Sequence, residues 1–106
     1  MTPRLQDLLT ELDTRLRALY GKRLERLVLF GSQARGDAEP GSDIDVLVVL
    51  RGIVTPSREI ARTGEVCTEL SLKYNVVVSC LFVSARRFSR EKSPLLLNVR
   101  KEGVAI

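Results

Sequence analysis

Two aspartates at the start of an apolar run are spaced to hold a metal ion together. Asp43 and Asp45 are two residues apart, so in a β-strand both side chains leave the same face. Strand geometry separates them by roughly 6–7 Å, and at an effective dielectric of about 20 two such charges repel by roughly 2–3 kcal/mol. A cation between them removes this cost, and Mg²⁺ completed by substrate phosphates is the usual one. We therefore predict a magnesium site at Asp43 and Asp45.

A glycine–serine pair lies upstream, directly after another apolar run. Gly31 lets the backbone approach an anion closely, and amide N–H groups of a short helical turn after it can point at phosphate oxygens. The Ser32 hydroxyl adds a donor, and Arg35 follows about one turn later, where its guanidinium could clamp a triphosphate.

Taken singly, each motif has an ordinary explanation. An isolated pair of aspartates can cap a turn and form a surface salt bridge, and a Gly-Ser dipeptide can be a plain turn. Together they indicate a triphosphate beside its metal ion, because one motif ends a predicted strand and the other begins the next. We expect Asp43 and Asp45 to lie within about 5 Å of the Gly31–Ser32 turn, close enough to share a metal-bound phosphate.

The elements that position these residues are visible in the hydrophobic pattern. Three apolar runs, apolar on both faces through their middle, are predicted to be central strands covered by helices: Leu24–Phe30, Ile44–Leu50 and Val76–Val83. A short final strand is predicted at Val104–Ile106. Helices are expected after Thr2-Pro3, Thr55-Pro56 and Ser93-Pro94, where the hydroxyl residue can cap and proline can occupy the first position; Gly21 and Gly103 end the first and third.

This order of elements predicts one α/β (α+β) domain over residues 1–106. A chain of 106 residues is long enough for one core and too short for two. The helices should pack against a mixed β-sheet in two layers.

Composition excludes several kinds of chemistry. The chain has no histidine, so it has no Ser-His or Cys-His nucleophile and no imidazole base or ligand. The net charge of +4 is mild, the basic residues are dispersed along the sequence and only 5% of residues are aromatic. Direct binding of nucleic acid is therefore disfavoured, and it stays a third alternative that rests on the basic balance alone. Cys67 and Cys80 fit neither a zinc spacing nor a CxxC pair and are expected to be buried thiols in a reducing compartment.

The longest stretch without charge, Tyr74–Ala85, has twelve residues and cannot cross a bilayer. No apolar segment follows a basic N-terminus, so we expect no signal peptide and a cytoplasmic protein that does not contact membranes.

The spacing of the two motifs resembles that of a known family. Gly31-Ser32, ten intervening residues and Asp43-x-Asp45 match the G-S-x(10)-D-x-D signature of the DNA polymerase β-like nucleotidyltransferases, and Ala34–Gly36 is similar to the minimal nucleotidyltransferase (MNT) subgroup. The resemblance implies the polymerase β-like fold. It also implies that the Gly-Ser pair holds a nucleoside triphosphate, with ATP the expected nucleotide, and that the aspartates bind Mg²⁺ during transfer of a nucleoside monophosphate to a hydroxyl.

The subgroup resemblance also implies a protein partner. Several of its members are antitoxins that pair with a helical HEPN toxin and attach AMP to one of its tyrosines. We therefore expect a protein adenylyltransferase of a toxin–antitoxin system. The sequence leaves the oligomeric state open, and a homo-oligomer is compatible with it.

One departure from the family pattern opens an alternative. Active members carry a third acidic residue on the next strand, whereas Asn75–Cys80 contains none. Val77 aligns with that position, with Ser79 as the other choice, and neither can take a proton as a carboxylate does. Glu65 or Glu69 could substitute from the preceding helix. Otherwise, the chain is a catalytically impaired module that binds a nucleotide or a partner.

Overall fold

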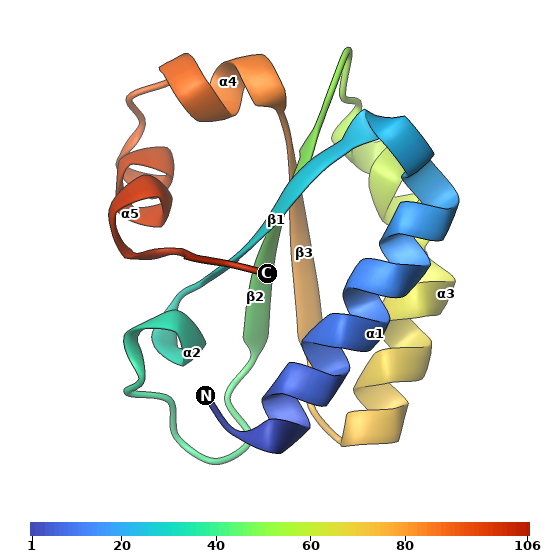
Figure 1. Ribbon diagram of the computed structural model, residues 1–106, viewed down its shortest axis with the longest axis vertical. Coiled ribbons are helices and arrows are strands. Elements are labelled where there is room, and N and C mark those ends of the chain that lie inside the picture. Colours follow the sequence, from blue (N-terminus) through green and yellow to red (C-terminus); the bar gives the residue numbers. More distant parts are fainter.

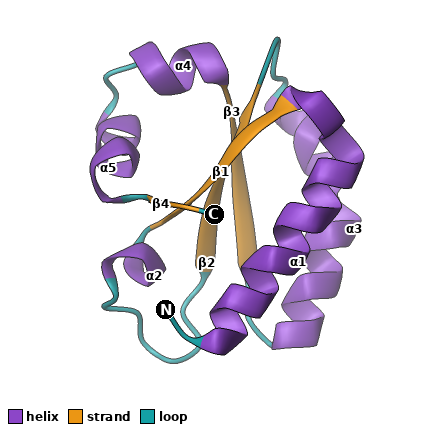
Figure 2. Cartoon of the chain, in the orientation of Figure 1, coloured by secondary structure: helices purple, strands orange, loops and turns teal.

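Helices and strands alternate through most of the chain in a computed structural model, which describes residues 1–106. The strands are β1 (Leu24–Phe30), β2 (Ile44–Leu50), β3 (Val78–Ser84) and β4 (Val104–Ala105). The helices are α1 (Pro3–Tyr20), α2 (Ser32–Arg35), α3 (Pro56–Tyr74), α4 (Ala85–Arg90) and α5 (Pro94–Glu102), and a 3₁₀ turn, η1 (Gly21–Arg23), follows α1. Figures 1 and 2 show this arrangement.

The strands form one mixed sheet in the order β3-β2-β1-β4. β1 is antiparallel to both β2 and β4, and β3 is parallel to β2. The end of β1 therefore lies beside the start of β2, and β3 starts on the other side of β2. This confirms the predicted α+β domain with a mixed sheet, and it brings the loop after β1 to the strand that carries the aspartates.

The two faces of the sheet carry different layers (Figure 1). Alternate residues of β1 and β2, such as Leu29 and Val46, belong to the main core, which α1 and α3 complete. The intervening residues, such as Leu47 and Val49, pack on the other face against α5 in a smaller core. This second core covers the face onto which Asp43 and Asp45 are predicted to open. No helix is long and apolar enough to span a membrane.

The predicted helix starts hold, although one cap differs. The Thr2 and Ser93 hydroxyls accept hydrogen bonds from the N–H groups of Leu5 (3.2 Å) and Leu96 (3.3 Å). The Thr55 side chain makes no capping bond. Its backbone carbonyl accepts instead from the N–H groups at positions 58 and 59, so Pro56 and the backbone start α3.

The region around β3 departs most from prediction. β3 begins at Val78, two residues later than predicted, and it lies at the edge of the sheet rather than at its centre. Val77 and Leu81 are accordingly 57% and 42% exposed. The prediction of a central strand was wrong because an apolar run does not show how many neighbours a strand has. Helix α4 was not predicted; the Ser84 hydroxyl caps it by accepting from the Arg87 N–H.

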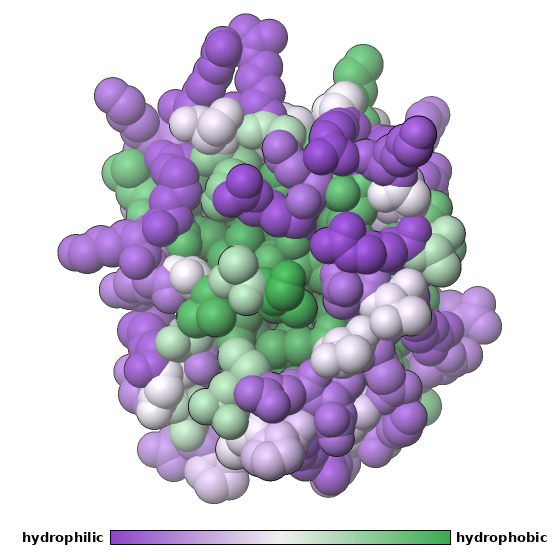
Figure 3. Space-filling model, in the orientation of Figure 1, coloured by the Kyte–Doolittle hydropathy of each residue, from purple (hydrophilic) through white to green (hydrophobic).

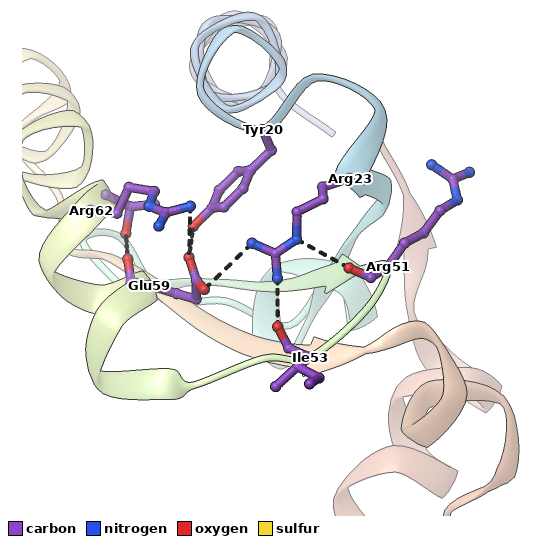
Figure 4. Close-up of polar contacts among 7 residues, drawn as sticks. Tyr20, Arg23, Arg51, Ile53, Glu59 and Arg62 are labelled. Atoms are coloured by element: carbon purple, nitrogen blue, oxygen red, sulfur yellow. Dashed lines mark hydrogen bonds and ion pairs between the residues drawn. The ribbon is translucent and has the colours of Figure 1, made fainter.

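The buried carboxylate of Glu59 is the centre of a polar network at the end of the sheet opposite the aspartates (Figure 4). Glu59 of α3 is 3% exposed and accepts a hydrogen bond of 2.7 Å from the Tyr20 hydroxyl. Arg23 and Arg62 each lie 3.7 Å from its oxygens. Arg23 also donates to the carbonyl of Ile53 at 2.7 Å. The network thus joins the end of α1 to the start of α3.

The two cysteines are neighbours rather than separate buried thiols. Cys67 of α3 and Cys80 of β3 are free and only half-buried, and their Sγ atoms are 3.7 Å apart. The hydrogen-bonding contact with Cys80 lowers the pKa of Cys67 to about 7, against the opposing effect of burial.

Candidate functional site

Strand pairing places Asp45 at the meeting point of three strands. In the register of the sheet it lies between Phe30, the last residue of β1, and Ser79 of β3. Its neighbour Ile44 points into the main core, so Asp45 points to the opposite face, the one that carries Leu47 and Val49. Asp43 precedes β2 by one residue and is exposed.

Gly31 fits closely against the Asp45 carboxylate, and a side chain at this position would be strained and would displace that carboxylate. Its φ of 74° is unfavourable for a residue with a side chain, and a Cβ atom there would lie 2.7 Å from Asp45 Oδ2. The structure therefore brings together the first residue of one motif and the second aspartate of the other, as predicted. Their roles as phosphate and metal ligands stay predictions.

The loop after Gly31 forms the expected short helical turn. The Gly31 carbonyl accepts from the N–H groups of Ala34 and Arg35, both at 3.1 Å, and Gly36 ends α2 with a φ of 81°. By position, the N–H groups of Ser32 and Gln33 have no acceptor within the helix. Ser32 is half-buried at the first position of α2.

The electrostatics of the aspartate pair favour a cation. Partial burial raises the pKa of Asp45, and the neighbouring charge of Asp43 raises it further. Ionised Asp45 is therefore destabilised where it stands, as the sequence spacing predicted. A divalent cation next to both carboxylates would reverse this effect.

Arg35 pairs with carboxylates other than those of Asp43 and Asp45. It is exposed, its Nε donates to Asp37 at 3.3 Å, and its Nη1 lies 3.8 Å from a carboxylate oxygen of Glu102 on α5. Exposed ion pairs of this kind contribute about 0–1 kcal/mol. Arg35 could exchange them for phosphate contacts at little cost, but it makes no contact with the pair here.

No carboxylate occupies the position on β3 where a third acidic residue was sought. Ser79 lies directly across from Asp45, while Val77, just before β3, accepts the Ile44 N–H through its carbonyl at 2.8 Å. The structure contains no cluster of three or more acidic or cysteine side chains that could hold a metal ion. Two protein ligands are thus the most that this site offers, which suits Mg²⁺ only when phosphates and water complete its shell.

The substitutes considered on α3 do not reach the site. α3 packs on the main-core face, whereas Asp45 opens to the other face. Glu69 pairs with Arg15 of α1 at 2.5 Å, and Glu65 is exposed. The proposal that either glutamate replaces the third acid was wrong, since sequence position alone does not show which face a helix covers.

A cavity of about 520 Å³ lies next to the aspartates but not at them. Gln33 and Ser42 line it, together with Arg4 and Tyr74 from the two long helices. Asp43, Asp45 and Gly31 do not line it. Gln33 also donates to the Ser42 carbonyl at 3.3 Å. This hydrogen bond joins α2 to the residue that precedes Asp43. No sequence signal could have found this cavity, because its walls come from segments far apart in the chain.

Comparison with known proteins adds a family and a set of relatives. The family described as "Nucleotidyltransferase domain" matches residues 9–100. A protein of Methanocaldococcus jannaschii named "Putative protein adenylyltransferase" is 40% identical over 76 residues, which cover 72% of this chain and 70% of the relative. Another of the same name and organism is 32% identical over 73 residues, covering 69% of this chain and 73% of the relative.

Solved structures share the fold. One described as a "putative minimal nucleotidyltransferase" superposes with a TM-score of 0.60 at 27% identity, covering 100% of this chain and 97% of that one. A toxin–antitoxin crystal structure with AMP-PNP superposes with a TM-score of 0.62 at 23% identity, covering 91% of this chain and 69% of that one.

Proposed function

Since the chain belongs to the nucleotidyltransferase domain family, we propose that it transfers AMP from Mg²⁺–ATP to a hydroxyl group of a partner protein. In this proposal it is the antitoxin of a HEPN/MNT toxin–antitoxin pair, and the acceptor is a tyrosine of the helical partner. The observation that carries it is the packing of Gly31 against Asp45, 2.7 Å from a Cβ position to the carboxylate oxygen. It joins the phosphate motif to the metal motif.

Each residue of the site has a role in the proposed reaction. Asp43 and Asp45 would hold Mg²⁺, which supplies charge neutralisation for the triphosphate. The Ser32 hydroxyl and the first N–H groups of α2 would bind phosphate oxygens. Arg35 would leave Asp37 and Glu102 to clamp the triphosphate.

The transfer itself forms one bond and breaks another. The acceptor oxygen bonds to the α-phosphorus, the bond from that phosphorus to the pyrophosphate oxygen breaks, and the acceptor proton must go to a base. No carboxylate of β3 is placed to take it, because Ser79 stands opposite Asp45. In the proposed complex, the partner supplies that base together with the hydroxyl.

The relatives support the nucleotide and the partner. Two of them are named for protein adenylyltransfer. One structure of the same fold is a toxin–antitoxin complex that contains AMP-PNP. Mg²⁺, ATP and a toxin partner are therefore the ligands to test first.

The test is mass spectrometry of a candidate helical HEPN-type protein after co-expression with this chain. The expected result is a partner that carries an added AMP on a tyrosine. Asp43→Asn should abolish the modification because it removes a metal ligand. Asp37→Asn is the matched control, since it removes the same charge from the same loop while its partner is Arg35. An unmodified partner in a stable complex would contradict the catalytic proposal.

A second candidate, a binding module without catalysis, is favoured by one observation. The residue across from Asp45 is a serine, and no third ligand stands near the pair. Ser79→Asp separates the two candidates, with Val77→Asp as its comparison before β3. If transfer appears only in the Ser79→Asp variant, the natural chain is the binding module; transfer by the natural chain itself supports the enzyme.

A further inference from the structure

The fold collects basic residues that the sequence disperses. The segment from Ser84 to Lys101 has six basic residues and one acidic residue, a net charge of +5. The rest of the chain has 11 basic and 12 acidic residues and sums to −1, so this segment accounts for the whole excess of positive charge. In Figure 3, long hydrophilic side chains project from the end of the molecule where Figure 1 places α4.

Five arginines define this region, which we call the arginine surface: Arg26, Arg86, Arg87, Arg90 and Arg100. Arg26 comes from β1, three of the others from α4 and its start, and Arg100 from α5. One cavity of about 420 Å³ is lined by Arg86 and Arg87, and a second of about 520 Å³ by Arg26, Arg86, Arg90 and Arg100. Arg86 lines both hollows, so they adjoin at this side chain, and we call the two hollows together the basic track.

The guanidinium groups on this track are positioned but not neutralised. Arg26 lies 5.4 Å from the centre of the Phe88 ring. Arg100 donates to the carbonyls of Phe88 and Glu91, which carry no net charge. Of the five, only Arg87 has a carboxylate partner, Glu91 at 2.8 Å, and the other ion pairs of the chain lie elsewhere.

The arginine surface is separate from the aspartate site. β3 starts beside Asp45 and runs for seven residues to Ser84, where α4 begins. At about 3.3 Å per residue, its length places the two sites roughly 20 Å apart. The arginines are therefore too far away to bind the triphosphate held at Gly31 and Asp45.

The chemistry of the track matches phosphate groups better than it matches a protein surface. Arginine presents paired N–H donors that fit phosphate oxygens, and contacts to a phosphodiester backbone need no apolar anchor. A stable protein interface needs a buried apolar centre. The larger hollow, which four of the five arginines line, offers only Ala85 and Phe88 as apolar lining, with Glu25 as its one carboxylate. Ile53, Val54 and Phe82 line only the smaller hollow, beside Arg86 and Arg87.

From this geometry we propose that the arginine surface binds the phosphodiester backbone of a nucleic acid, without reading its sequence. The binding site is distinct from the nucleotide site of the proposed transfer reaction and does not depend on it. The sequence made nucleic-acid binding only a third alternative, because its basic residues are dispersed along the chain. Only the packing of β1, α4 and α5 makes them neighbours.

The experiment measures fluorescence anisotropy of labelled uridine RNA and thymidine DNA, without ATP or Mg²⁺. Strands of about 20 nucleotides exceed the roughly 4–16 nucleotides that a small single-strand-binding fold covers. Binding should weaken with salt, with a slope of log K against log salt near −3, because each neutralised phosphate of a single strand contributes about −0.7 and four arginines are free of carboxylates. A preference for one strand would identify the natural source.

Paired variants test the location of the site. Arg86→Glu with Arg90→Glu should weaken binding by more than about tenfold and reduce the slope to near −1.4. Arg15→Glu with Arg17→Glu on α1 changes the net charge equally and should retain the affinity at the arginine surface. Melting curves confirm that all variants fold. No binding at about 50 mM salt, equal loss in both double variants, or tighter binding of polyglutamate of the same length would overturn the proposal, the last in favour of an acidic protein.

Discussion

Asp45 is the residue whose charge the fold opposes most clearly at the candidate site. Burial and Asp43 raise its pKa above the ordinary value of 3.8, so ionisation costs stability in the folded protein. The favourable contribution of the protonated form is complete below the unfolded pKa of 3.8 and is lost as the pH rises through the higher folded pKa. At neutral pH without metal, the ionised carboxylate of Asp45 therefore lowers the free energy of unfolding by its full amount.

Replacing the carboxylate by an amide should stabilise the metal-free domain. We predict that Asp45→Asn raises the melting temperature in EDTA at pH 7, and that the gain shrinks as the pH falls towards 4. Solvent screening keeps the gain at or below about 1 kcal/mol, which corresponds to at most about 4–8 °C for a domain of this size. Asp37→Asn, whose carboxylate is exposed, serves as control. A variant that melts lower than the wild type would show that Asp45 makes a structural contact instead.

The spacing in the sequence predicted that Gly31 and Asp45 lie close together, but it did not predict the residues around them. Asp45 faces away from the main core because strand residues alternate, and Gly31 follows β1, whose last residue, Phe30, pairs with Asp45. The direction of Arg35 and the position of Ser79 opposite Asp45 were not predictable. The first depends on the nearby end of α5, and the second on a parallel pairing between strands that α3 separates in the chain.

At the scale of elements, the buried Glu59 network fixes how α1 and α3 meet the sheet. Burial and the hydrogen bond to Glu59 raise the pKa of Tyr20 well above 10, so the neutral phenol contributes stability. That contribution is present below the unfolded pKa of 10.0 and is lost as the pH rises through the folded value.

We predict that Tyr20→Phe lowers the free energy of unfolding by about 1.5–3 kcal/mol, because the hydroxyl donates to a buried charged group. Denaturant titrations at neutral pH measure this loss, and a titration above pH 10 should show a smaller difference between variant and wild type. Tyr74→Phe is the matched control: its hydroxyl donates to Glu11 near the surface, so its loss should be smaller. Equal losses would mean that burial of Glu59 adds nothing to the contact.

The elements that sequence predicted best are those with strong local signals. β1 and β2 appear with the predicted bounds, and the helices begin at proline after a hydroxyl residue. β3 was placed two residues early because Val76 and Val77 extend the apolar run before the ladder begins. α4 was missed because its six residues follow a strand directly, and Ser84 is both the last strand residue and the cap.

At the scale of the whole molecule, the fold separates two places for anions. The Gly31 and Asp45 site lies where β2 and β3 begin, and the arginine surface lies beyond the end of β3 (Figure 1). The first would bind an anion together with a metal ion, because the carboxylates of Asp43 and Asp45 repel an anion that carries no metal. The second would bind one directly. A ligand that needs Mg²⁺ therefore reports on the first site, and one that does not reports on the second.

This separation makes the response to Mg²⁺–ATP a test of the aspartate site alone. We predict that Mg²⁺–ATP stabilises the domain by about 2.7 kcal/mol at a hundredfold excess over its dissociation constant, measured as a rise in melting temperature. Asp43→Asn with Asp45→Asn should abolish the part that requires Mg²⁺, while Arg86→Glu with Arg90→Glu should retain it. ATP with EDTA is the control for direct binding to the arginines. A wild-type domain whose melting temperature is unchanged by Mg²⁺ with any of the four triphosphates would have a vestigial site, because a working site would couple the binding of the metal ion to that of the triphosphate.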